Sequence, residues 1–385
     1  MKVLMISDVY FPRVNGVSTS MQTYRRELES LGASVTVIAP DYGDTGNEDS
    51  ILRVKASKIP FDPEDRLMSL SGAKCLAGGL GRHDIVHIQT PFIAHYAGIA
   101  VAKGWGVPCL TTYHTFFEEY FHHYIPFLPK GWLKLGARTL SRDQCNQVDE
   151  VVVPSSAMAR TLEDYGVRQP IHIIPTGIPD EMYRPGNGSE FRAKHGIGRN
   201  RKMMLFVGRV AKEKNIEFLV RAAQRAKQAL PGLLLVIAGE GPAEGEIRKL
   251  ITALNMENNA LMLGNLDRND ALIDCYAAAD AFVFASRTET QGLVLLEAMA
   301  AGKPVISIAH MGTLDILKTG CGAIIPEDDE EAFAAEMIDL MRDESRREAI
   351  GEAALAHADQ WRAKEIAKRM LVRYESLVKK MQTGR

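Results

Sequence analysis

Two cations follow a short apolar run in the second half of the sequence. Residues Met203–Val207 are all apolar, Gly208 follows them, and Arg209 and Lys214 lie within the next six residues. Such a run predicts a parallel strand buried on both faces, and Gly208 allows the backbone to turn where that strand ends. Doubly wound sheets bind ligands at the carboxyl ends of their strands, and Arg beside Lys suits a diphosphate. The alternative is a strand-to-helix loop with solvated cations.

A single carboxylate stands in an apolar segment further along the chain. Between Gly292 and Gly302, Glu297 is the only polar side chain, so the segment predicts a helix buried on nearly all sides. A buried carboxylate is costly without partners, and the hydroxyls of a sugar or ribose are suitable ones. Glu289 precedes the helix, and the N–H groups of Gly292 and Leu293 at its start suit an anionic oxygen. Alternatively, Glu297 is a core carboxylate bonded to backbone and Glu289 is a helix cap.

The apolar pattern of the chain predicts the elements that would position these residues. Short runs rich in Val and Ile alternate with amphipathic segments, which is typical of doubly wound α/β domains. The predicted strands of the first part are Val3–Ile6, Ser34–Ala39, Asp84–Ile88, Val107–Thr112, Glu150–Val153 and Ile171–Ile174. Those of the second part are Met203–Val207, Leu233–Ala238, Ala260–Leu263, Ala281–Phe284, Pro304–Ile308 and Ala323–Ile325. Helices are expected at Ser18–Leu31 and at Ser155–Tyr165, the latter capped by Ser155.

A segment rich in Gly and Pro, from Pro175 to Gly188, interrupts this alternation. It is the best candidate for a linker between domains. We therefore expect an N-terminal domain at residues 1–178 and a C-terminal domain at 179–362. A final segment at 363–385 contains one amphipathic helix, predicted at Ala363–Lys380.

Composition excludes several classes of protein. The formal net charge of −2 over 385 residues provides no overall basic field for nucleic acid. The five cysteines are odd in number and contain no CxxC pair, which argues against a disulfide framework or a zinc site. There is no apolar run of about 18 residues and no secretory pattern at the start. We expect a cytoplasmic protein without an obligatory metal.

Taken in order, these motifs are similar to those of the retaining family 4 glycosyltransferases. The shared features include Asp8–Pro12, Asn15-Gly16-Val17, Tyr113-His114-Thr115 and the two segments described above. The resemblance implies a GT-B fold, in which two Rossmann-like domains face each other across a cleft and the final helix crosses back to the first domain. It also implies a hexosyltransferase that uses a nucleotide diphosphate sugar, such as a UDP- or GDP-sugar, and needs no other cofactor.

The resemblance also assigns roles to individual residues. Arg209 and Lys214 match the pair that holds the donor diphosphate, and Glu297 matches the carboxylate that bonds the ribose. Glu289 matches a carboxylate near the sugar hydroxyls, and His114 matches a histidine near the transferred sugar. The implied catalytic residues are Arg209, Lys214, Glu289 and His114. The implied donor-binding residues are Gly16, Arg209, Lys214, Glu289, Gly292, Leu293 and Glu297. Two departures from the family are Asn15-Gly16 and Met311-Gly312, where many members have two glycines.

A glycine-rich segment, Gly239-Glu240-Gly241-Pro242-Ala243-Glu244-Gly245, raises the question of a dinucleotide site. Its spacing is G-x-G-x3-G rather than G-x-G-x2-G, and Pro242 removes one N–H that a phosphate could use. We therefore favour a structural turn. Two alternatives from other functional classes remain, an NAD-dependent oxidoreductase and a non-catalytic module that binds sugar nucleotides.

The segment Phe116–Arg142 combines aromatic and basic residues. Seven aromatic residues lie between positions 116 and 132, and Lys130, Lys134, Arg138 and Arg142 recur at every fourth position. A basic amphipathic helix beside apolar side chains is typical of interfacial membrane binding, whereas a solvated helix over an aromatic core is the alternative. The Thr288–Val294 segment is most similar to the family branch that glycosylates diacylglycerol, and phosphatidylinositol mannosyltransferases stay open. These features predict a lipid acceptor and a peripheral position on the cytoplasmic face of the inner membrane, with a soluble or polysaccharide acceptor as the alternative.

Overall fold

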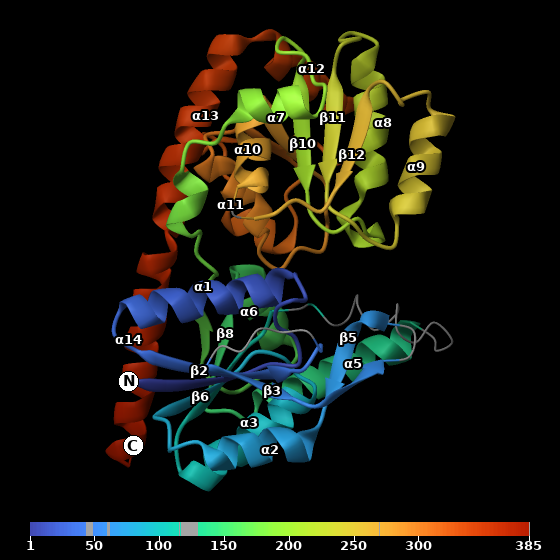
Figure 1. The fold of residues 1–385 in the computed structure, drawn as a ribbon. Coiled ribbons are helices and arrows are strands. Elements are labelled where there is room, and N and C mark those ends of the chain that lie inside the picture. The colour runs from blue at the N-terminus through green and yellow to red at the C-terminus, as the bar shows by residue number, and fades with distance from the viewer. Residues whose placement is uncertain (44–48, 60–61, 115, 117–129, 269, 385) are drawn as a thin grey trace. The chain divides into compact units, whose positions relative to one another are not determined.

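The computed structural model describes residues 1–384 except 44–48, 60–61, 115, 117–129 and 269. The chain forms two compact units (Figure 1). The first unit comprises Met1–Gly177 together with Ala363–Arg385, and the second comprises Ile178–Arg362. Each unit is built on a parallel sheet with helices on it, so the predicted α/β class with two doubly wound sheets is confirmed.

The first sheet has seven parallel strands in the order β3-β2-β1-β6-β7-β8-β9. The strands are β1 (Lys2–Ile6), β2 (Ser34–Pro40), β3 (Ile51–Val54), β6 (Ile85–Ile88), β7 (Cys109–Thr112), β8 (Glu150–Val153) and β9 (Ile171–Ile173). A separate antiparallel hairpin is formed by β4 (Ala56–Ile59) and β5 (Asp62–Met68). The helices before the second unit are α1 (Gly16–Ser30), α2 (Leu70–Gly79), α3 (Ile93–Trp105), α5 (Lys130–Cys145) and α6 (Ser156–Asp164).

The second sheet has six parallel strands in the order β12-β11-β10-β13-β14-β15. The strands are β10 (Met203–Val207), β11 (Leu234–Ala238), β12 (Ala260–Gly264), β13 (Ala281–Phe284), β14 (Val305–Ser307) and β15 (Ala323–Ile324). The helices are α7 (Gly188–Lys194), α8 (Ile216–Lys227), α9 (Glu244–Ala253), α10 (Ala271–Ala278), α11 (Leu293–Ala300), α12 (Glu330–Arg342) and α13 (Glu344–Ala358). The 3-10 turns are η1 (Asp180–Tyr183), η2 (Lys212–Lys214), η3 (Met311–Asp315) and η4 (Asp359–Trp361).

The local sequence explains where several helices begin. The Asn15 side chain accepts a 2.8 Å hydrogen bond from the N–H of Ser18 and thereby caps α1. The Ser155 side chain accepts from the N–H of Met158 at 3.4 Å, which confirms the predicted cap of α6. Gly292 has φ +94° and ends the loop before α11 in a left-handed conformation that suits glycine.

The last helix, α14 (Ala363–Gln382), belongs to the first unit, where it packs against α1. The buried Tyr374 hydroxyl and the Nδ1 atom of His87 are 2.6 Å apart. Arg373 donates two 2.7 Å hydrogen bonds to the buried carboxylate of Glu150. Because a buried carboxylate needs such a partner, the sheet of the first unit depends on a helix from the far end of the chain.

Candidate functional site

The strand order of the second sheet reverses between β10 and β13, which are hydrogen-bonded neighbours. In doubly wound sheets such a switch point is where ligands bind. Arg209 follows β10, and Glu289 lies in the loop after β13, so both predicted residues lie at this edge. The loops are also bonded to each other, because the Ser286 hydroxyl donates to the carbonyl of Glu213 at 2.8 Å.

Lys214 and Glu289 form an ion pair at this edge, through the Nζ and Oε1 atoms. Both side chains are largely buried, with 22% and 15% of their surface exposed. η2 holds Lys214, and the Asn215 side chain donates to the carbonyl of Ala285 at 3.2 Å. Arg209 is half-buried on the same loop. The structure therefore brings a cation and a carboxylate together where the sequence predicted a binding site for a charged ligand.

Glu297 is buried in α11, as the sequence predicts, with 2% of its surface exposed. Its Oε1 atom accepts from the guanidinium of Arg268, and its Oε2 atom accepts a 2.9 Å hydrogen bond from the hydroxyl of Tyr276. The charge of Glu297 raises the pKa of Arg268, and burial, followed by that same charge, raises the pKa of Tyr276 well above its usual value. Sequence reasoning missed both partners, although Arg268 follows β12 at the same sheet edge as Arg209.

The loop that leads into α11 is fixed by η3. The N–H of Gly312 donates to the carbonyl of Glu289 at 2.9 Å. A side chain at position 312 would lie 2.0 Å from the carbonyl oxygen of Thr290, so only glycine allows this close approach. Leu293 begins α11, where backbone N–H groups are without helical partners. The predicted anion-binding groups thus lie on the same short loop as Glu289.

An arginine–carboxylate pair holds the outer end of this loop. Arg287 donates to the two carboxylate oxygens of Asp328 at 2.7 and 2.6 Å. His310 Nε2 is 3.3 Å from the same carboxylate. The hydrogen bonds from Arg287 lower the pKa of Asp328. The loop that carries Glu289 is therefore attached both to η3 and to the segment before α12.

The segment from Gly239 to Gly245 serves the fold of this edge. A side chain at Gly239, where φ is +140°, would lie 2.0 Å from the carbonyl oxygen of Gly208. The N–H of Val210 donates to the carbonyl of Glu240 at 2.9 Å. The first turn of α9 carries Glu244, which disfavours a phosphate there. The geometry agrees with a structural turn beside Arg209 and offers no support for a dinucleotide site.

His114 belongs to the first unit, just after β7. Its Nε2 atom is 2.9 Å from Oε1 of Gln89, and burial lowers its pKa to about 4. The imidazole is therefore neutral near pH 7. Asp8 follows β1 at the same sheet edge and accepts from Thr90 at 2.7 Å and from the N–H of Ala94. Burial raises the pKa of Asp8 to about 6.

Gly16 also belongs to the first unit, as the first residue of α1. A Cβ atom added there would meet nothing within 4 Å. The six other predicted site residues belong to the second unit: Arg209, Lys214, Glu289, Gly292, Leu293 and Glu297.

The basic segment of the first unit forms α5, which exposes both apolar and basic side chains. Trp132 and Leu135 have 76% and 65% of their surface exposed, and Leu140 is exposed as well. Lys134 and Arg138 are exposed on the same helix, and the guanidinium of Arg138 lies 5.5 Å from the centre of the Tyr165 ring. The aromatic residues at positions 117–127, which the sequence suggests for membrane contact, lie outside the described residues. Phe116 is half-buried.

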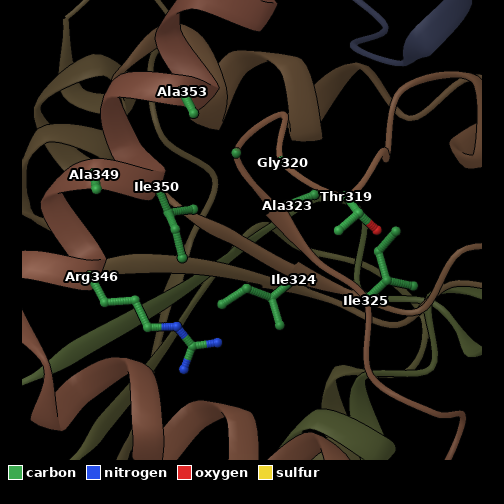
Figure 2. A pocket seen from close by; sticks show the side chains of 10 residues that line it. Thr319, Gly320, Ala323, Ile324, Ile325, Arg346, Ala349, Ile350 and Ala353 are labelled. Carbon is green, nitrogen blue, oxygen red and sulfur yellow. The ribbon is translucent and has the colours of Figure 1, made fainter.

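A groove of about 470 Å³ lies elsewhere in the second unit, between β15 and α13 (Figure 2). It is lined mainly by small and aliphatic side chains, with Arg346 at one side. None of the predicted site residues lines it. Across the described part of the chain, no cluster of three or more His, Cys, Asp or Glu side chains has metal-site geometry. Within that same part, no helix is long and apolar enough to cross a bilayer.

Comparison with known proteins identifies the family. The model for "Glycosyl transferases group 1" matches residues 188–357, and the model for "Glycosyltransferase Family 4" matches residues 14–182. The alpha-monoglucosyldiacylglycerol synthase of Streptococcus pneumoniae is 32% identical over 317 residues, which cover 80% of this chain and 71% of that protein. A GDP-mannose-dependent alpha-mannosyltransferase of Corynebacterium glutamicum is 26% identical, covering 84% of this chain and 76% of its own.

Solved structures agree on the fold. The sucrose-phosphate synthase of Thermosynechococcus elongatus superposes with a TM-score of 0.82 at 20% identity, covering 98% of both chains. HepE of Anabaena, solved in complex with UDP-glucose, gives 0.78 at 18% identity, covering 98% of this chain and 100% of that one. This chain therefore belongs to the family 4 glycosyltransferases, and it is a hexosyltransferase with the GT-B fold.

Proposed function

We propose that this enzyme transfers a hexose from a nucleotide diphosphate sugar to a membrane lipid such as diacylglycerol, with retention at the anomeric carbon. The observation that carries the proposal is the ion pair of Lys214 and Glu289 at the switch point of the second sheet, with Arg209 on the same loop. Cations and a carboxylate at one edge suit a ligand that combines a diphosphate with sugar hydroxyls.

The two charged groups of this pair have separate roles in the proposal. Lys214 and Arg209 bind the diphosphate, while Glu289 accepts hydrogen bonds from the sugar hydroxyls. Lys214 forms an ion pair with Glu289 in the structure. When the donor binds, its diphosphate takes the place of the Glu289 carboxylate beside the ammonium group of Lys214. Glu297 bonds the ribose hydroxyls, and Arg268 and Tyr276 hold that carboxylate in place.

Transfer breaks the bond between the anomeric carbon and the phosphate oxygen, and negative charge grows on the diphosphate. Arg209, Lys214 and the N–H groups of Gly292 and Leu293 stabilise this charge, and each such contact contributes about 2.7–4 kcal/mol, or 10²–10³ in rate. The acceptor oxygen bonds the anomeric carbon on the same face, and its proton passes to the departing phosphate. The neutral imidazole of His114 and the backbone beside Gly16 orient the sugar.

The exposed apolar and basic side chains of α5 support a lipid acceptor. An exposed Trp132 and Leu135 beside Lys134 and Arg138 form a surface that suits the boundary of an anionic bilayer. Each cation near such a surface contributes about 1 kcal/mol. The S. pneumoniae relative, an alpha-monoglucosyldiacylglycerol synthase, is named for the same class of acceptor.

One experiment tests donor and acceptor together. Radioactive UDP-glucose and GDP-mannose are incubated separately with the enzyme and liposomes that contain diacylglycerol, and the chloroform-extractable label is counted. Label in the lipid fraction from one donor supports the proposal and identifies that donor. Turnover of a donor without label in lipid would contradict the lipid acceptor and direct the search to soluble or polymeric acceptors.

A further inference from the structure

Gln89 is a buried amide at the switch point of the first sheet. It follows β6 directly, and its backbone N–H donates to the carbonyl of Ile6 in β1 at 2.9 Å. The strand order reverses at this pair of strands, because β1 lies between β2 and β6. Only 2% of the Gln89 residue is exposed. The side chain therefore lies in the first unit at the kind of position where doubly wound sheets bind ligands.

The amide oxygen of Gln89 determines the protonation of His114. Oε1 of Gln89 lies 2.9 Å from Nε2 of His114. An amide oxygen only accepts hydrogen bonds, so the proton of the neutral ring is on Nε2 and the lone pair is on Nδ1. The ring stays neutral near pH 7 because burial lowers the pKa of His114 to about 4. The pair thus selects one of two tautomers.

The other end of the same amide has no partner among the residues that the structure describes. The Nε2 atom of Gln89 is buried and makes no hydrogen bond to any of the described residues. A buried N–H group without an acceptor is costly, and nearly all such groups in native proteins are satisfied. An acceptor supplied by a ligand removes this cost. The orphaned amide nitrogen lies on the residue that holds His114.

We propose that Gln89 both positions His114 and binds substrate: its amide oxygen fixes the Nε2–H tautomer of His114, and its amide N–H donates to an oxygen of the transferred sugar. The second part rests on the hexosyl transfer proposed above. The first part is a property of the folded protein alone. With the proton fixed on Nε2, the Nδ1 lone pair of His114 is the only acceptor that the ring offers.

Nuclear magnetic resonance tests the tautomer without any turnover. Long-range proton–nitrogen spectra of protein labelled with 15N-histidine distinguish Nε2–H, Nδ1–H and doubly protonated rings. The signal that disappears in H114N identifies His114. We expect the wild-type ring at pH 7.5 as Nε2–H, and we expect Q89M to shift it to a mixture of both tautomers. A wild-type Nδ1–H ring, or an unchanged Q89M spectrum, would overturn the positioning role.

Steady-state kinetics test the contact with substrate. Q89M removes both the oxygen and the N–H, whereas Q89E keeps an oxygen toward His114 and replaces the NH2 group with a second oxygen, at the cost of an added carboxylate charge. We expect kcat to fall about 10- to 100-fold in both variants, while Nε2 of His114 stays protonated in Q89E. Wild-type kcat and KM in Q89E would overturn the amide contact. Thermal melts of both variants establish that the loss is not unfolding.

Gln147 offers a matched control. Its Oε1 atom lies 3.4 Å from Nε2 of His95, so it forms the same type of pair, but Gln147 is exposed. We expect Q147M to keep wild-type kcat and the wild-type His114 signal.

The experiments distinguish failure of the proposed hexosyl transfer from failure of the proposed role of Gln89. An enzyme that transfers no sugar from any donor refutes the proposed function and leaves the tautomer result standing. A Q89M variant with wild-type kcat and tautomer refutes only the role of Gln89.

Discussion

The hydroxyl of Tyr276 donates a 2.9 Å hydrogen bond to Oε2 of Glu297, and both side chains are buried in the second unit. Arg268 donates to the other carboxylate oxygen. A cation and a phenol therefore share the carboxylate of Glu297 inside an apolar helix.

Glu297→Gln removes the charge but keeps the shape of the side chain. We expect the affinity for the donor nucleotide to fall about tenfold or more, because the amide is a weaker acceptor for ribose hydroxyls than a carboxylate. Isothermal titration calorimetry with UDP and with GDP measures this. Glu240→Gln is the control, since Glu240 is an exposed carboxylate at the same sheet edge, bonded to Asn265. Equal losses in the two variants would contradict a specific role for Glu297.

Tyr276→Phe removes the hydroxyl that donates to Glu297 and keeps the aromatic ring. We expect the free energy of unfolding to fall by about 1–3 kcal/mol, because a buried carboxylate oxygen loses its hydrogen bond. Urea denaturation followed by circular dichroism gives this value. A variant as stable as the wild type would indicate that Arg268 alone holds Glu297.

Arg209→Ala and Lys214→Ala test the diphosphate contacts. Each is expected to lower kcat by about 10²–10³, because charge on the leaving group loses one stabilising cation. Lys212→Ala is the control: Lys212 lies two residues from Lys214, is exposed, and pairs with Glu246 at 3.3 Å. It should keep wild-type turnover. Full activity of Arg209→Ala would refute the proposed mechanism.

Lys134→Glu combined with Arg138→Glu tests membrane contact through α5. Reversal of two charges at about 1 kcal/mol per cation should abolish co-sedimentation with anionic liposomes. Lys55→Glu combined with Arg168→Glu reverses two exposed charges elsewhere on the first unit and should sediment like the wild type. Trp132→Ser tests the apolar contribution separately. Unchanged sedimentation of the α5 variants would favour a solvated helix face.

Asp8 makes stability depend on pH. Its pKa is raised from 3.8 to about 6 by burial, so the folded protein binds more protons than the unfolded chain between these values. The contribution of Asp8 to stability is therefore largest at low pH and is lost as pH rises through about 6. The loss amounts to about 3 kcal/mol. Asp8→Asn does not titrate, so its stability relative to wild type should be higher at pH 7 than at pH 4.5, as measured by urea unfolding.

Much of the fold follows from the sequence because buried parallel strands are apolar throughout. All twelve predicted strands are present, from β1 to β15, within one or two residues of their expected ends. The apolar pattern does not predict β3 or the hairpin of β4 and β5. β3 is an edge strand that contains the half-buried Arg53, so it lacks the continuous apolar signal of the central strands.

The partners of the site residues were harder to predict than the residues themselves. A lone Glu297 in an apolar helix signals a buried carboxylate, but nothing in the local pattern indicates that Arg268 and Tyr276 share it. Gln89 lies 25 residues from His114, and the contact arises only because β6 and β7 are adjacent. Strand order places such residues side by side, and local hydrophobic periodicity carries little information about strand order. The roles assigned to Arg209, Lys214, Glu289 and His114 stay predictions until the variants are measured.

The return of α14 to the first unit has a consequence for synthesis of the chain. A ribosome releases the 1–177 segment long before it reaches Tyr374 and Arg373, which contact His87 and Glu150. Until then Glu150 lacks its guanidinium and the first sheet lacks one covering helix. The second unit, continuous in sequence, can complete its folding earlier. The first unit is therefore translated first but completes its folding last. A stop codon shortly before residue 363 would remove α14 and so impair the folding of the first unit rather than that of the second.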